Sequence, residues 1–188
     1  MSSIKLIHSG GNSVSISAPT SNPSSDRTLL LPSNADSTID TLNRAGNILQ
    51  VQHNLDTTSS GFSTSSTSYV TDSVLPTLAI TPSSASSKIY VSAFIGMQHD
   101  QSDQVENTIY RIISGGATTE LSGGNTYGLV FKGGATTEYG YVGVQFVDSP
   151  STTSAVTYTW YARSEFGGSV SPNHGGCAFG MTLMEIEA

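Results

Sequence analysis

The sequence predicts an all-β protein, with a short N-terminal β module followed by a jelly-roll-like β-sandwich. Three observations predict this class: strand patterns recur from residue 68 onward, turn-forming glycine, proline and serine clusters separate them, and only 11% of the 188 residues are charged. So few charged residues argue against long solvent-exposed helices. Strands are expected at 68–71, 77–81, 88–97, 105–113, 127–131, 139–147, 155–162 and 177–186.

Aromatic residues divide the chain into two parts. The 8 Tyr, 6 Phe and 1 Trp all lie from Phe62 onward. Aromatic side chains bury the most area, so a long segment without them struggles to form a core alone. We therefore predict a β module over residues 1–56 that takes its core from a neighbour, a Ser/Thr-rich linker over 57–67, and the sandwich over 68–188.

The predicted module contains recognisable short elements. Residues 4–6 and 14–17 alternate apolar and polar positions around a glycine-containing turn, which is typical of a hairpin. A third short strand over 28–32 is stopped by Pro32. Apolar spacing over 37–50 fits a helical turn.

A hexapeptide, Gly-Gly-Ala-Thr-Thr-Glu, occurs at both 115–120 and 133–138. Two copies fall short of the three or more that a stacked repeat architecture needs. We interpret them as two similar loops at one end of the sandwich.

The Tyr-Thr-Trp-Tyr run from Tyr158 to Tyr161 carries the one tryptophan. Strand alternation places Tyr158 and Trp160 on one face and Tyr161 on the other. Trp160 is expected in the core, with a subunit contact as the alternative. Exposed tyrosines elsewhere in the second half would suit interfaces or stacking on sugars.

The sequence carries no nucleophile elbow, phosphate loop or zinc-protease motif, so we expect no enzyme and no cofactor. A single cysteine, Cys177, excludes an intrachain disulfide and a Cys-based zinc site. It follows His174 by three residues, which permits a thiol–imidazole pair, but a buried structural cysteine is the favoured interpretation.

Groups of polar and acidic side chains allow two kinds of site, a metal site and a pair of catalytic carboxylates. His99, Asp100, Asp103 and Glu106 could hold calcium if their loop folded back, although a solvated loop without metal is favoured. Paired carboxylates for glycoside hydrolysis could come from Glu120, Glu138 and Glu165, and solvated loop glutamates are again the favoured interpretation.

The net charge and the hydropathy of the chain exclude two classes of partner, nucleic acids and membranes. The chain has 7 basic and 14 acidic residues, a net charge of −7, and so lacks the basic surface that nucleic acids require. It contains no apolar run of the roughly 20 residues that a membrane span needs, and no secretory signal pattern. We expect synthesis in the cytoplasm, no nucleic-acid binding and no membrane insertion.

Two groups of segments resemble bacteriophage virion proteins. Residues 11–14, 18–19, 26–32 and 42–50 resemble the short β-repeat modules of bacteriophage tail-fibre and related virion appendage proteins, especially of marine and cyanobacterial phages. Residues 68–70, 80–91 and 182–186 resemble the terminal β-sandwich that often follows such modules.

The resemblance implies a homotrimer located in the virion. It would be a short trimeric fibre, spike or knob that docks on other virion proteins of the tail, portal-proximal region or capsid and presents the sandwich for host-surface adhesion, to a glycan or a protein. A capsid decoration or cement protein on the phage head is the first alternative, and a spike-borne polysaccharide depolymerase is the second. A cellular adhesin or cytokine-like jelly roll is a further alternative.

Receptor contacts are expected from loops at 99–106, 115–120, 133–138 and 164–173. The candidate contact residues in and beside them are His99, Asp100, Asp103, Glu106, Glu120, Glu138, Phe166 and His174.

Overall fold

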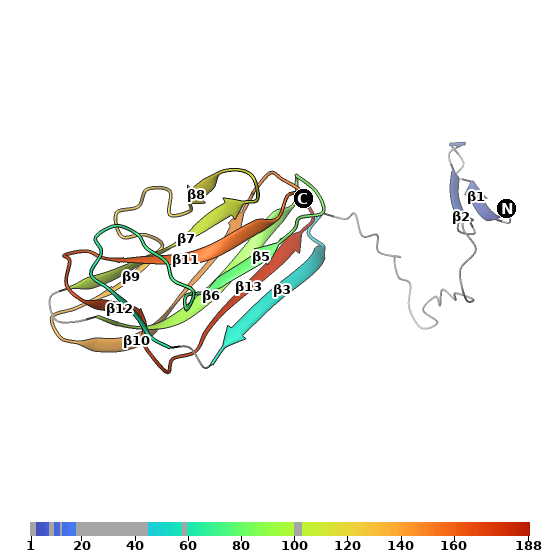
Figure 1. Cartoon of the computed structure of the whole chain (residues 1–188). Coiled ribbons are helices and arrows are strands. Elements are labelled where there is room, and N and C mark those ends of the chain that lie inside the picture. Colours follow the sequence, from blue (N-terminus) through green and yellow to red (C-terminus); the bar gives the residue numbers. More distant parts are fainter. Residues whose placement is uncertain (1–2, 8–9, 12, 18–44, 58–59, 100–102) are drawn as a thin grey trace. The chain divides into compact units, whose positions relative to one another are not determined.

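The computed structural model describes residues 3–7, 10–11, 13–17, 45–57, 60–99 and 103–188 (Figure 1). The chain forms two compact units, Met1–Ile39 and Asp40–Ala188. The described residues are strands, turns and connecting segments, with no helix among them. The predicted all-β class is therefore confirmed.

The described part of the first unit is a β-hairpin. Strands β1 (Ser3–Ile7) and β2 (Ser13–Ser17) pair antiparallel, with Ile4 opposite Ile16. Gly11 in the turn has a φ of 91°, a left-handed conformation that glycine adopts without steric cost. The hairpin prediction is confirmed, whereas the predicted strand at 28–32 lies outside the described residues.

The first sheet of the second unit has six strands. They are β3 (Ile48–Asp56), β4 (Phe62–Thr64), β6 (Lys88–His99), β10 (Glu138–Asp148), β12 (Val170–Asn173) and β13 (Phe179–Ile186). Strand β6 is central: β10 pairs along one edge, while β13 and then β12 pair along the other. β3 and β4 complete the sheet beyond β13 and β12.

The second sheet has five strands. They are β5 (Thr77–Ile80), β7 (Gln104–Ile113), β8 (Thr118–Glu120), β9 (Val130–Gly133) and β11 (Val156–Ser164). β11 lies between β5 and β7, and the far edge of β7 pairs with β8 and β9. All pairings between named strands in the two sheets are antiparallel, as expected for a sandwich.

Alternating side chains from both sheets form one core. The pattern is clearest on β6, where Ile89, Val91, Ala93 and Ile95 are buried, and on β11, where Tyr158 and Trp160 are buried. The prediction that Trp160 lies in the core is thus confirmed. The other fully or nearly buried apolar residues are Leu75, Ile80, Met97, Val105, Ile109, Val144, Val156, Ala162, Val170, Phe179, Met181 and Leu183.

The structure differs from the predicted division of the chain. β3, assigned in the prediction to the N-terminal module and partly to a helical turn, pairs along its whole length with β13 of the sandwich. β4, placed in the predicted linker, pairs with β12. The unit boundary accordingly falls between Ile39 and Asp40. Residues 48–56 obtain their burial from the sandwich of the same chain.

The sandwich has two distinct ends, which the strand registers define. At the entry end, Gly46 and Asn47 exchange backbone hydrogen bonds with Glu187, so the chain enters the sandwich beside its own C-terminal strand. The far end carries the β6–β7 connection, the turn between β9 and β10, and the segments on either side of β12. In Figure 1 the C-terminus marks the entry end at the right of the sandwich, and β9 and β12 lie toward the far end.

Candidate functional site

Three of the predicted contact residues are accessible at the far end of the sandwich. Phe166 is 64% exposed. Glu138, at the start of β10, forms an ion pair with Lys132 at the end of β9, and the hydrogen bond and charge of Lys132 lower the pKa of Glu138. The His174 ring packs edge-on against Tyr139, with ring centroids 4.9 Å apart. The far end thus presents aromatic rings beside a charged pair.

The loop that presents Phe166 is organised by a buried carboxylate. Asp103, 3% exposed, accepts hydrogen bonds from the Ser164 hydroxyl at 2.8 Å and from the Phe166 backbone N–H at 3.2 Å. Burial raises the pKa of Asp103, but hydrogen bonds from Ser164, Gln104, Phe166 and Gly168 outweigh it and lower the pKa overall. Asp103 therefore shapes the loop from within, and its side chain is inaccessible to a receptor.

His99 and Glu106 are also inside the protein, which corrects the predicted solvated loop. β6 extends through His99 and β7 begins at Gln104, so both residues are strand residues with 0% exposure. Glu106 accepts a hydrogen bond from Arg163 Nε at 2.6 Å. A receptor has no access to either side chain in this structure. Asp100 lies outside the described residues.

Arg163 forms the centre of a polar cluster on the outer side of the five-stranded sheet. Besides binding Glu106, its guanidinium lies 4.8 Å from the centroid of the Tyr69 ring and donates to the Thr126 carbonyl at 2.8 Å. Burial raises the pKa of Tyr69 to about 12; the Arg163 charge opposes this shift, and the Glu106 and Glu120 charges add to it. The cluster joins the segments before β5 and after β8 to the sheet.

Glu120 belongs to this sheet as well. Its carboxylate accepts hydrogen bonds from the Thr108 hydroxyl and from the Ser122 N–H, the latter at 2.7 Å. Burial raises the pKa of Glu120, but the hydrogen bonds from Thr108, Ser122 and Gly124 lower it overall. These hydrogen bonds attach the segment after β8 to the sheet through the Glu120 carboxylate.

The two copies of the hexapeptide lie at opposite ends of the sandwich. The first follows β7 after Ile113, at the entry end, and the second follows β9, where Gly133 pairs with Gln104 at the other end of β7. Nine residues of β7 separate these positions, about 30 Å in an extended strand. The prediction that both copies form loops at one end is wrong, because β9 runs back along β7 between them.

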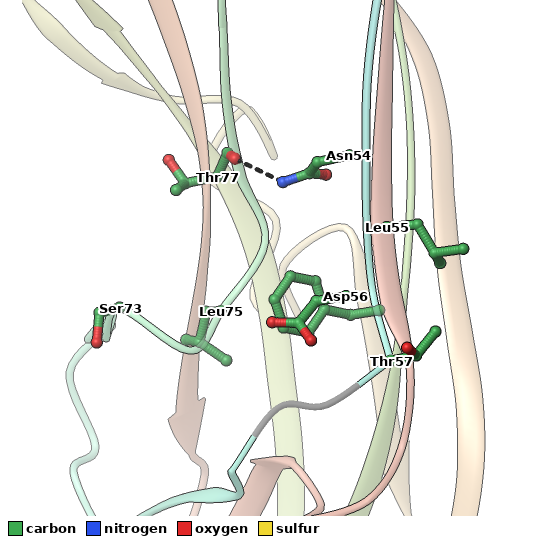
Figure 2. A pocket seen from close by; sticks show the side chains of 8 residues that line it. Asn54, Leu55, Asp56, Thr57, Ser73, Leu75 and Thr77 are labelled. Carbon is green, nitrogen blue, oxygen red and sulfur yellow. Dashed lines mark hydrogen bonds between the residues drawn. The ribbon is translucent and has the colours of Figure 1, made fainter.

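A pocket of about 500 Å³ opens between β3 and the segment that precedes β5. Figure 2 shows Asn54 and Asp56 pointing into it, toward Ser73, Leu75 and Thr77, whereas Leu55 and Thr57 point away. Asn54 Nδ2 donates to the Thr77 carbonyl at 3.0 Å and closes one end of the pocket.

The pocket combines polar and apolar groups. The residues that line it include the polar Asp56 and Ser73 and the apolar Leu75 and Phe179. The Asp56 carboxylate and the Ser73 hydroxyl can form hydrogen bonds with a hydroxyl-bearing ligand, whereas Leu75 and Phe179 are 1% and 5% exposed and offer it little apolar surface. Sequence reasoning missed the pocket because its residues come from segments far apart in the chain, which only strand pairing brings together.

Cys177 is half-buried and packs closely against β6. Its backbone N–H donates to the His174 carbonyl at 3.1 Å, which closes a tight turn, and its Sγ lies 2.7 Å from where a Cβ on Gly96 would stand. The favoured interpretation as a structural cysteine agrees with this close packing.

Two searches of the described residues were negative. No group of three or more His, Cys, Asp or Glu side chains is placed to hold a metal ion within the part of the chain that the structure describes. Over the same residues, no helix has the length and apolar character needed to cross a membrane.

Comparisons with known proteins give distant matches only. No protein-family model and no curated protein matches the sequence. Among solved structures, the chain is similar to one described as the structure of infectious bursal disease virus Gx strain, with a TM-score of 0.41 and 15% identity over 86% of this chain and 38% of that one. It is also similar to the infectious bursal disease virus VP2 subviral particle, with a TM-score of 0.40 and 16% identity over 93% of this chain and 42% of that one.

The chain therefore spans less than half the length of either of these two viral chains. The fold class rests on this chain's own strands and their pairings, which form two antiparallel sheets around one core.

Proposed function

We propose that the protein is a virion structural protein that forms a short homotrimeric fibre, spike or knob. Its N-terminal unit docks on other virion proteins, and its sandwich carries the host-surface contacts. The proposal starts from the phage-appendage resemblance of the sequence.

One structural observation supports this division of labour. The chain enters the sandwich beside Glu187, while the accessible contact candidates Glu138, Phe166 and His174 belong to the far end. A module tethered at one end is free to present the other to a surface. Three copies on one particle would add weak contacts into strong attachment, since each contact after the first forms at a high effective concentration.

The far end fits a glycan or a protein surface. Phe166 offers an aromatic face for stacking, and Lys132 and Glu138 offer hydrogen bonds at the same end. The pocket that contains Asp56 adds a recess for a hydroxyl-bearing group along the β3 side.

Particle imaging tests the proposed location. Gold-labelled antibodies against the chain are expected to mark the tail or its attachment structures on purified particles. Labels spread over the head would show that the protein is a capsid decoration protein instead. Particles without any label would overturn a role in the virion.

Binding to host cells tests the proposed contact. Fluorescently labelled protein is expected to bind cells that the particle infects, and Phe166→Ser to weaken binding by about tenfold, as expected for an aromatic contact worth roughly 1.4 kcal/mol. Tyr127→Ser, which removes an aromatic ring 45% exposed on another part of the surface, is the matched control. Equal losses in both variants, or full binding by Phe166→Ser, would contradict the far-end assignment.

A further inference from the structure

The outer face of the six-stranded sheet carries many large apolar side chains. Seven of the ten large apolar side chains that are exposed among the described residues stand on its strands, with exposures between 38% and 63%. They are Ile48, Val51 and Leu55 on β3, Phe94 on β6, and Tyr139, Tyr141 and Val147 on β10. A monomer rarely leaves so many large apolar groups on one face in water.

Strand register places these side chains on one face of the sheet. Phe94 on β6 lies opposite Gly143 on β10 and Gly180 on β13, and Gly180 in turn lies opposite Leu55. The Phe94 ring covers the glycine positions: a Cβ on Gly180 would come within 2.9 Å of its Cε1 atom. Tyr141 lies 6.2 Å from Phe94 between ring centroids. One register row of polar residues, Gln145, Ser92, Thr182 and His53, crosses the face between this group and the row that holds Val147 and Val51.

Strand β3 directs its large apolar side chains toward the outer face of the sheet. Two of its polar residues turn toward the sandwich: Gln50 Nε2 donates to the Thr81 carbonyl and to Glu185 Oε2, each at 2.6 Å, and Asn54 Nδ2 donates to the Thr77 carbonyl. His53, by contrast, lies on the outer face opposite Thr182. Its apolar residues Val51 and Leu55 are 50% and 56% exposed. An edge strand normally has the opposite arrangement, with apolar residues inward and polar residues outward.

The same face lacks acidic residues. Its outward positions on β3, β6, β10 and β13 hold no Asp or Glu among the described residues, although the whole chain has 14 acidic residues and a net charge of −7. The charged or titratable groups there are Lys88, near the entry end, and His53. It is the part of an acidic molecule on which another acidic copy meets least repulsion.

We propose that this outer face is the surface through which copies of this chain associate. The occupant follows from the chemistry. Besides Phe94, Tyr139 and Tyr141, the large exposed residues of the face are the aliphatic Ile48, Val51, Leu55 and Val147, which offer no stacking platform for a sugar. One lysine and one histidine offer little to a phosphate backbone. A second acidic copy buries the apolar area without placing a carboxylate in the contact.

The inference goes beyond the proposed function. The trimer proposed there derives from the phage-appendage resemblance and from the weak core of the N-terminal segment, whereas this interface derives from the sandwich and requires no virion role. A solution mass of one copy would overturn both the proposed trimer and this interface. Particle labelling tests the virion location alone, and substitutions in the sandwich and in the N-terminal unit show which of the two holds the copies together.

Light scattering on the full chain, at micromolar concentration, tests the interface. The wild-type mass is expected to be a multiple of 19.6 kDa, three times that value for the trimer. Val51→Glu on β3 and Val147→Glu on β10 are each expected to weaken association by about 100-fold or more, because each buries an unpaired carboxylate in the contact. Circular dichroism and thermal melting verify that the variants fold.

Matched controls place the same charge elsewhere. Phe131→Glu on β9 and Phe166→Glu in the far-end loop replace side chains that are 49% and 64% exposed, and both are expected to keep the wild-type mass. Ile16→Pro disrupts the β1–β2 ladder, where Ile16 pairs with Ile4, and tests whether the N-terminal unit alone holds the copies together.

Three results would overturn the interface. They are a wild-type mass of one copy, an unchanged mass in folded Val51→Glu and Val147→Glu, and loss of association in Ile16→Pro alone. The last result would assign the contact to the N-terminal unit.

Discussion

The indole Nε1–H of Trp160 donates a hydrogen bond to Oδ1 of Asn107 across 2.8 Å in the interior of the sandwich. Both side chains are 0% exposed. The pair lies on neighbouring strands, β11 and β7, and gives the largest core side chain a defined position. A buried indole N–H without an acceptor would lose its hydrogen bond to water and gain nothing in exchange.

Asn107→Ala removes that acceptor and is expected to lower the free energy of unfolding by about 1–3 kcal/mol, the cost of an unsatisfied buried donor. Urea unfolding followed by tryptophan fluorescence measures this directly, because the chain has 1 Trp. Asn125→Ala, at an exposed turn, is the control and is expected to cost less than about 1 kcal/mol. Equal costs at both positions would show that the indole hydrogen bond contributes nothing.

Arg163→Met leaves the Glu106 carboxylate buried without its partner. We expect a loss of about 2–4 kcal/mol in the free energy of unfolding, below the full cost for a completely buried pair because the Arg163 side chain is 27% exposed. Glu106→Gln in the Arg163→Met background removes the stranded charge and should restore part of the loss. Thermal or urea unfolding of the two single variants and the double variant measures the coupling. If the double variant is as unstable as the sum of the singles, the pair is not coupled.

Glu185 makes stability depend on acid pH. Burial raises its pKa, but hydrogen bonds from Ser83, Gln50 and Ser87 outweigh burial and place it below the ordinary value of 4.5. A carboxyl whose folded-state pKa lies below its unfolded value stabilises the fold fully above the unfolded pKa, and this contribution is lost as pH falls through the folded pKa.

The wild type should therefore lose stability as pH falls below about 4.5, and Glu185→Gln should lose less over that interval. Urea unfolding at a series of pH values measures the slope. Glu138→Gln is the control, because Glu138 is at the surface and its ion pair with Lys132 is expected to add little. A Glu185→Gln curve parallel to the wild type would contradict the assignment.

Strands β6 and β11 could be predicted from the sequence because apolar residues recur at every second position along them. On both strands, these positions match burial on one sheet face. The predicted strand at 127–131 was displaced, since pairing with β7 selects Val130–Gly133 instead. Short strands such as Thr118–Glu120 and Val170–Asn173 depend on pairing with a neighbour and have too few residues to show a period.

β3 was missed because its pattern is inverted. With Val51 and Leu55 outward and Gln50 and Asn54 inward, the sequence gives no sign of which side meets the core. The sequence predicts a solvated loop around His99 and Glu106 because polar residues usually lie in solvent. Glu106 is buried through pairing with Arg163, 57 residues later in the chain, a partner that local sequence does not identify.

Gly96 should control the accessibility of the single thiol. A Cβ at Gly96 would stand 2.7 Å from Cys177 Sγ and even closer to Cys177 Cβ, so Gly96→Ala must displace the turn between β12 and β13. We expect faster reaction of Cys177 with a disulfide reagent, with a stability loss of about 1–3 kcal/mol. Gly140→Ala is the control on the neighbouring strand, because a Cβ there meets Lys132 Cε at an ordinary 3.5 Å. An unchanged thiol reaction rate in Gly96→Ala would show that the turn adapts without exposing Cys177.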